Sequence, residues 1–172
     1  AYKCFDKQMH GFFAMPDALP VGFEAMDWVR REIDGRLNPV ESVDAVIVGA
    51  GFSGMYQLHK LRDMGLSVQV FEAGDDVGGT WYWNRYPGAR VDIESMDYSY
   101  SFSKELQQDW VWSEKYSPQP ELLRYAQHVA DRFDLKRDIA FNTRVASAHF
   151  DDDNNQWMVT TEDGRRVRAR YL

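Results

Sequence analysis

A short apolar run followed by three spaced glycines places the strongest constraint on how this chain folds. Residues 43–48 are apolar and mostly β-branched apart from one aspartate, which is typical of a buried parallel strand. The glycine motif Gly-Ala-Gly-Phe-Ser-Gly follows at 49–54, and a stretch with helical periodicity runs from it to Gly65. A second apolar run covers 67–71 and ends at Glu72. This order of elements predicts a βαβ unit at the start of a parallel sheet.

Each glycine of the motif has a mechanical role in holding a dinucleotide. Gly49 allows the tight turn, Gly51 lets the backbone approach a pyrophosphate, and Gly54 lets helix and strand pack closely. The helix N-terminus adds free N–H groups and a partial positive charge. Glu72, 18 residues beyond Gly54, can accept hydrogen bonds from a ribose 2′-OH and would repel a 2′-phosphate. The motif therefore predicts a site for FAD or NAD and not for NADP. The alternative is a glycine-rich turn in some other βαβ unit, with Glu72 merely exposed.

A crowded segment, GGTWYWNRYPGARVDIES, follows the second strand at residues 78–95. Its glycines, its Pro-Gly pair and its clustered aromatic side chains make it a poor candidate for a helix or strand. Loops on a rigid scaffold often carry function, so we expect this segment at the functional site. Its aromatic residues could instead belong to the core or to a domain interface.

The remaining sequence predicts one helix and an antiparallel meander. An amphipathic helix is expected at 121–133, after the breaker Ser-Pro-Gln-Pro, and a short strand at 139–141. Three alternating strands are expected at 145–150, 156–161 and 165–172, joined by good turn sequences. These elements favour an α/β fold, namely an FAD-binding, two-dinucleotide-binding (Rossmann-like) domain with an antiparallel β-meander.

Residues 1–41 form a separate section before this domain, which we place at 42–172. The section contains scattered apolar side chains among prolines and a probable helix at 23–33. We expect it to pack as an arm on the body of the protein, since large exposed apolar clusters are uncommon on soluble monomers. The alternative is a partner-binding segment.

Composition limits the classes of function. With 20 basic against 27 acidic residues the formal charge is −7, which argues against nucleic acid as a partner. Cys4 is the only cysteine and the histidines have no ligand spacing, so we expect neither an intrachain disulfide nor a metal site. No apolar run reaches the roughly 18 residues of a membrane span and no signal peptide is visible, so we expect no membrane partner and a cytoplasmic location.

The sequence from about Val43 to Leu172 resembles the N-terminal part of the type I Baeyer–Villiger monooxygenases. The likeness rests on the glycine motif with Glu72 and, more specifically, on the string GGTWYWNRYPG-x-R-x-D at 78–92. The resemblance implies a protein that holds FAD tightly, reduces it with NADPH and uses O₂. A flavin peroxide would then insert oxygen next to a ketone carbonyl, giving an ester or lactone.

The resemblance also implies roles for individual residues. The expected cofactor-binding set is Gly49, Gly51, Ser53, Gly54, Glu72, Gly79, Thr80, Trp81, Tyr82, Trp83, Arg90, Val91, Asp92, Tyr98 and Val145. In this set Trp81 and Trp83 would offer flat apolar surface to FAD, and Val145 would offer backbone groups to the adenine. Asp92 would also be catalytic, by orienting an arginine that lies outside this chain segment. Asp92 could instead cap a short helix starting near Ile93.

The resemblance implies further parts beyond Leu172, including a second glycine motif for NADPH and the catalytic arginine. We therefore expect an N-terminal fragment that is inactive alone and continues into the remainder of the same polypeptide. Two alternatives stay open. One is a related flavin monooxygenase acting on nitrogen or sulfur, against which the WYWNRYPG string weighs, and the other is a non-catalytic FAD-binding module.

Overall fold

The computed structural model describes residues 26–30, 33 and 40–172, and the chain separates into two compact units, residues 1–40 and 41–172. In the first unit, residues 26–30 and 33 are helical, within the range predicted as a helix. The rest of that helix and the packing of the arm lie outside the described residues. The second unit carries the predicted βαβ start and meander.

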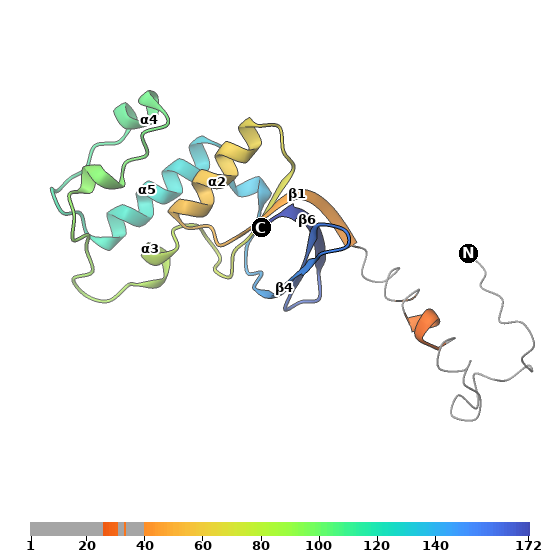
Figure 1. Ribbon diagram of the computed structural model, residues 1–172. Helices are drawn as coiled ribbons and strands as arrows, with labels where there is room; N and C mark the ends of the chain where they lie inside the picture. Colours follow the sequence, from red (N-terminus) through yellow and green to blue (C-terminus); the bar gives the residue numbers. More distant parts are fainter. Residues whose placement is uncertain (1–25, 31–32, 34–39) are drawn as a thin grey trace, which may run out of the picture. The chain divides into compact units, whose positions relative to one another are not determined.

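The second unit is built on one six-stranded sheet with the strand order β3-β2-β1-β6-β5-β4. The neighbouring strands β1 and β6 are labelled in Figure 1. Its first half is parallel and consists of β1 (Val40–Val48), β2 (Val68–Phe71) and β3 (Ile139–Ala140). Its second half is the antiparallel meander β4 (Val145–Asp151), β5 (Gln156–Thr161) and β6 (Arg166–Tyr171). The α/β Rossmann-like fold with a meander is thereby confirmed.

Two clusters of buried side chains lie on the two faces of this sheet. Val46 and Ile47 are neighbours on β1, and alternation along the strand sends them into different clusters. Ile47 packs with residues of the helices α2 (Phe52–Asp63) and α5 (Gln119–Arg132), whereas Val46 packs with residues of β5 and β6. Side chains therefore pack against β1 on both faces of the sheet, and this packing fixes the position of its carboxyl end.

Several short elements were not predicted. The segment 78–95 contains one helical turn, α3 (Thr80–Trp83), although its composition argued against a helix. A 3₁₀ helix, η3 (Ser95–Tyr98), follows close to where the sequence allowed a short helix near Ile93. The helix α4 (Lys104–Asp109), which was not predicted, is capped by the side chain of Ser103. Such short turns depend on tertiary contacts, so they lack the long periodic pattern by which α2 and α5 were recognised.

Among the described residues, no helix is long and apolar enough to cross a membrane.

Candidate functional site

The glycine motif forms the turn between β1 and α2. Gly49 has a φ of 96°, and its N–H donates to the carbonyl of Phe71 on β2 at 2.8 Å. A Cβ on Gly54 would lie 2.0 Å from the Gly49 carbonyl oxygen, so only glycine fits there. The helix that follows has neither a side-chain cap nor an acidic residue in its first turn. Its terminal N–H groups are therefore open to an anion.

A second glycine turn lies directly on the first. Gly79 has a φ of 54°, and a Cβ added to it would lie 2.8 Å from the Cα of Gly51. Beside this contact the N–H of Gly78 donates to the carbonyl of Ala50 at 3.0 Å. The crowded segment 78–95 therefore begins in backbone contact with the glycine motif, as its position in the sequence led us to expect.

Two hollows open on either side of this contact and meet at Gly51, Gly79 and Thr80. We call the first the Glu72 hollow; its volume is about 460 Å³, within the range of small-molecule sites. We call the second, of about 400 Å³, the Trp81 hollow. Together they form a divided site at the carboxyl ends of β1 and β2, where ligands bind in open α/β sheets.

Most of the predicted residues line one of these hollows. Those in the Glu72 hollow are Gly49, Gly51, Glu72, Gly79, Thr80, Trp83 and Val145. Those in the Trp81 hollow are Gly51, Ser53, Gly79, Thr80, Trp81 and Tyr98. The other predicted residues, namely Gly54, Tyr82, Arg90, Val91 and Asp92, line neither hollow.

The carboxylate of Glu72 has a structural role that sequence reasoning missed. The residue is only 4% exposed. Its Oε2 accepts from the N–H of Ala50 at 2.7 Å, and its Oε1 accepts from the N–H of Gly74 at 2.7 Å. Glu72 thus ties the glycine motif to the loop after β2. Each carboxylate oxygen has a second lone pair, so the predicted bond from a ribose hydroxyl remains compatible with this arrangement.

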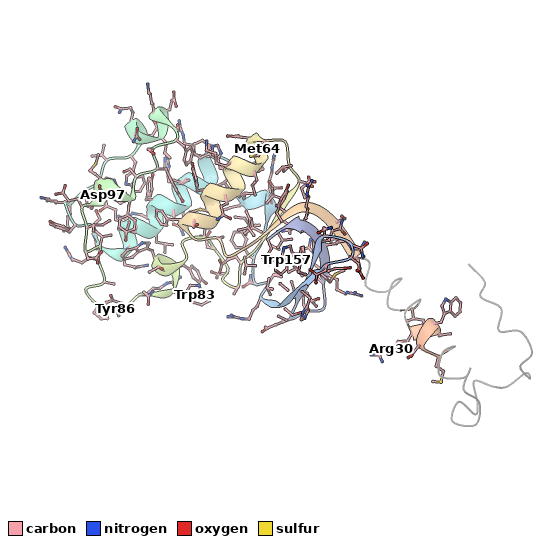
Figure 2. The ribbon with its side chains drawn as sticks, in the orientation of Figure 1. Arg30, Met64, Trp83, Tyr86, Asp97 and Trp157 are labelled. Atoms are coloured by element: carbon pink, nitrogen blue, oxygen red, sulfur yellow. The ribbon has the colours of Figure 1, made fainter. Side chains whose placement is uncertain are left out.

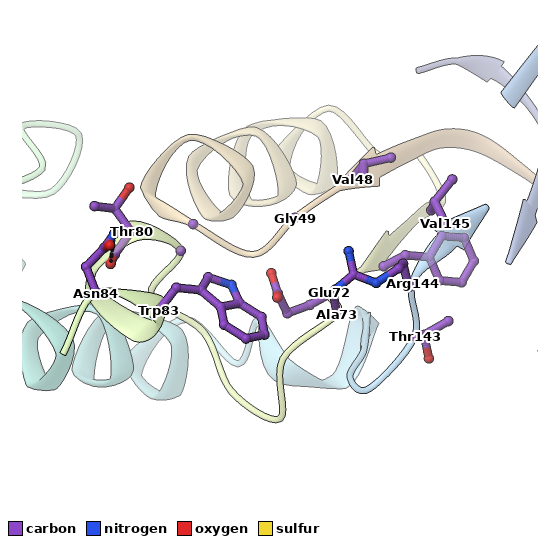
Figure 3. A pocket seen from close by; sticks show the side chains of 13 residues that line it. Val48, Gly49, Glu72, Ala73, Thr80, Trp83, Asn84, Thr143, Arg144 and Val145 are labelled. Atoms are coloured by element: carbon purple, nitrogen blue, oxygen red, sulfur yellow. Dashed lines mark hydrogen bonds between the residues drawn. The ribbon is translucent and has the colours of Figure 1, made fainter. Parts of the chain in front are cut away.

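The tryptophans of α3 face different environments. Trp83 is 56% exposed and lines the Glu72 hollow, where Figure 3 shows Glu72 between Trp83 and Arg144. Trp81 is buried, edge-on to Tyr98 with ring centroids 5.7 Å apart. The buried side chain of Gln119 donates to the backbone carbonyl of Trp81 and ties α3 to the start of α5. The two rings therefore belong to separate hollows.

The stretch from Arg90 to Asp92 lies outside the hollows. Arg90 is exposed and donates to Glu114 and to the carbonyl of Tyr116, while Val91 is buried against Trp81. Asp92 is exposed and has no hydrogen bond or ion pair to any residue that the structure describes.

Asp92 does not cap a helix, because η3 begins at Ser95 with Glu94 as its N-cap. Burial, and secondarily the negative charge of Asp92, raises the pKa of Tyr98.

Three polar residues that were not in the predicted set also line the Glu72 hollow, namely Asn84, Thr143 and Arg144. Arg144 is exposed and lies 3.9 Å from Glu162. The sequence feature that could have indicated Arg144 is its position one residue before the expected strand at Val145, because ligands in this fold bind near strand ends.

We predict that Glu72→Gln destabilises the protein even when no cofactor is present. An amide would direct N–H donors at one of the two backbone N–H groups and leave it unsatisfied, at a cost of about 1–3 kcal/mol. Denaturant unfolding of the cofactor-free protein measures this, with Asp152→Asn, an exposed carboxylate in a turn, as the control. Equal stability of Glu72→Gln and wild type would show that Glu72 does not brace the motif.

This chain is similar in sequence to several known proteins. Residues 47–110 match the family described as an NAD(P)-binding Rossmann-like domain. A Baeyer–Villiger monooxygenase of Pseudooceanicola batsensis is 50% identical over 130 residues, covering 75% of this chain and 24% of that protein. A phenazine N-monooxygenase of Lysobacter antibioticus is 51% identical over 130 residues, with the same coverage of 75% and 24%.

A solved structure of a monooxygenase is also similar to this chain. A structure described as oxidized steroid monooxygenase bound to NADP is 61% identical, with a TM-score of 0.74, over 75% of this chain and 25% of the other. The chain spans about a quarter of the length of the relatives it matches. Its relatives at about 50% identity include a Baeyer–Villiger monooxygenase and a phenazine N-monooxygenase, and the likeness covers about a quarter of each of them.

Proposed function

We propose that this chain is the FAD-binding part of an NADPH- and O₂-dependent monooxygenase that inserts oxygen next to a ketone carbonyl, giving an ester or lactone. The observation that carries the proposal is the pair of hollows meeting at Gly51 and Gly79, in a chain about 50% identical to Baeyer–Villiger monooxygenases. A cofactor with two halves joined by a pyrophosphate suits a site divided in this way.

The residues of the Glu72 hollow fit the adenosine half of FAD. The carboxylate of Glu72 is placed for the ribose hydroxyls, as in other Rossmann-like sites. The indole of Trp83 and the guanidinium of Arg144 border the same hollow and are both able to stack on a purine. The single acidic residue also disfavours a 2′-phosphate here, which supports FAD over NADPH at this site.

The pyrophosphate fits at the contact of the two glycine turns. A Cβ on Gly79 would clash with Gly51, so the backbone is bare where the phosphates approach. The open N-terminus of α2 supplies N–H donors and positive potential. The flavin half would then extend into the Trp81 hollow, beside the aromatic surface of Trp81 and Tyr98. FAD supplies the oxygen-transfer chemistry when bound, and these residues bind and orient it.

NADPH and the ketone would be bound by other parts of the polypeptide. The chain has one Gly-x-Gly-x-x-Gly motif, and we assign it to FAD. The remainder of the same polypeptide would supply the second nucleotide site and the arginine that Asp92 orients. The expected cytoplasmic location stays a prediction.

Oxygenation of nitrogen is the second candidate function. The WYWNRYPG string weighed against it in the sequence. However, the phenazine N-monooxygenase is 51% identical to this chain, as close as the Baeyer–Villiger relative. Overall identity over this part of the chain therefore does not separate the two activities, and the substrate must be tested directly.

We predict that the full-length protein purifies yellow with FAD and oxidises NADPH faster when a ketone is supplied. Product analysis should find an ester or lactone. A parallel assay with an aromatic N-heterocycle distinguishes the second candidate, which would give an N-oxide. A colourless protein that takes up no flavin on reconstitution would contradict both functions, and flavin binding without NADPH oxidation would indicate a non-catalytic module.

We further predict that Asp92→Ala leaves FAD bound but slows oxygenation roughly tenfold or more, because the arginine loses its partner. The exposed carboxylate of Asp92, which has no hydrogen bond or ion pair to any described residue, supports this role. The measurements are the flavin content and the rate of product formation. Asp97→Ala, an exposed carboxylate on η3, is the matched control. Unchanged turnover in Asp92→Ala would reject the proposed role.

A further inference from the structure

The side chain of Tyr82 lies on α3 between two residues that face the hollows, yet it faces neither. Thr80 lines both hollows and Trp83 lines the Glu72 hollow, whereas Tyr82 lines neither. Its ring lies instead against the loop that connects β2 to α3. A Cβ added to Gly74 would be 2.6 Å from Cε1 of Tyr82, and one added to Gly78 would be 3.3 Å from its Cβ. The ring therefore fills a space that Gly74 leaves open, and the Cβ and backbone of Tyr82 lie close to Gly78.

Polar contacts fix the ring in this space. The Tyr82 hydroxyl donates to Oδ1 of Asp75 at 2.6 Å and accepts from the N–H of Asp75 at 3.3 Å. The guanidinium of Arg85 lies over the ring, 4.6 Å from its centroid, and its Nε donates to the Tyr82 carbonyl at 2.7 Å. Tyr82 is thus held at its hydroxyl, on its face and at its backbone.

Tyr82 lies against two glycines of the loop after β2 that are hydrogen-bonded into the candidate cofactor site. Gly74 donates its N–H to Glu72, which in turn accepts from Ala50 in the glycine motif. Gly78 donates to the carbonyl of Ala50 from the other side. The ring of Tyr82 lies at Gly74, and its backbone N–H donates to the carbonyl of Gly79 at 3.0 Å, so the residue joins the two ends of this chain of bonds. Displacing the ring from Gly74 would therefore also act on the Gly78–Gly79 turn through the Tyr82 backbone.

We propose that Tyr82 is a positioning residue for the cofactor: its ring sets how closely the Gly78–Gly79 turn lies on the glycine motif, and so sets the shape of both hollows. The inference rests on the proposed FAD site. It assigns to Tyr82 an action through the glycine turns, in place of a direct contact with FAD.

The key experiment is a double-mutant cycle between Gly74→Ala and Tyr82→Ala in the full-length protein, read as the dissociation constant for FAD by flavin fluorescence. Gly74 does not have a positive φ, and an alanine Cβ there would lie 2.6 Å from Cε1 of Tyr82 and 3.2 Å from Oε1 of Glu72, so the ring is the group that must move most. Each single substitution should weaken FAD binding by about tenfold, within the range for coupled neighbours. The double variant should bind no more weakly than Tyr82→Ala alone, because the displaced ring is already gone.

Additive effects in the cycle, or unchanged affinity in Tyr82→Ala, would overturn the inference. Tyr82→Phe provides an independent check if the alanine variants do not fold. It keeps the ring and loses the Asp75 bond, so its affinity should fall by less than about fivefold. A loss as large as that of Gly74→Ala would reject a role for the ring itself. Tyr86→Ala is the matched control, because Tyr86 lies in the same segment and is 64% exposed (Figure 2). A wild-type protein that binds no FAD would instead overturn the proposed function, and the inference with it.

Discussion

The structure depends on the close contact between two glycine turns, one after β1 and one after β2. Both backbone polar groups of Ala50 take part in holding them. Its N–H donates to the buried carboxylate of Glu72, and its carbonyl accepts from Gly78. These bonds let the backbone of Gly79 rest on Gly51 with no side chain between them. A strip of bare backbone results, and such a strip suits the approach of a pyrophosphate.

The rest of the second unit supports this contact. The parallel pair β1 and β2 brings the two turns to the same edge of the sheet, and buried clusters on both faces hold β1 in place. The α3 turn is tied from one side by Gln119 at the start of α5 and from the other by the Tyr82 ring. These contacts fix the backbone that the two hollows share. A backbone held in place before a ligand binds reduces the cost of ordering the site.

The elements of the fold that depend on a local sequence pattern could be predicted from the sequence. The strand, glycine motif and second strand predicted the βαβ unit, and the alternating runs predicted the meander, because both signals repeat within a few residues. The role of Glu72 in bracing Ala50 could not be predicted, since it depends on a contact over 22 residues. The same holds for the α3 turn and for the direction of Tyr82. Two neighbours on one turn, Tyr82 and Trp83, point to different surroundings that only the fold defines.

We propose that the contact of the glycine turns divides one FAD site into an adenosine half and a flavin half. An experimental structure of the full-length protein with FAD bound would test this division. We expect the ribose at Glu72, the pyrophosphate over Gly51 and Gly79, and the flavin extending past Trp81 and Tyr98. FAD bound away from these glycines, or with its flavin in the Glu72 hollow, would contradict it.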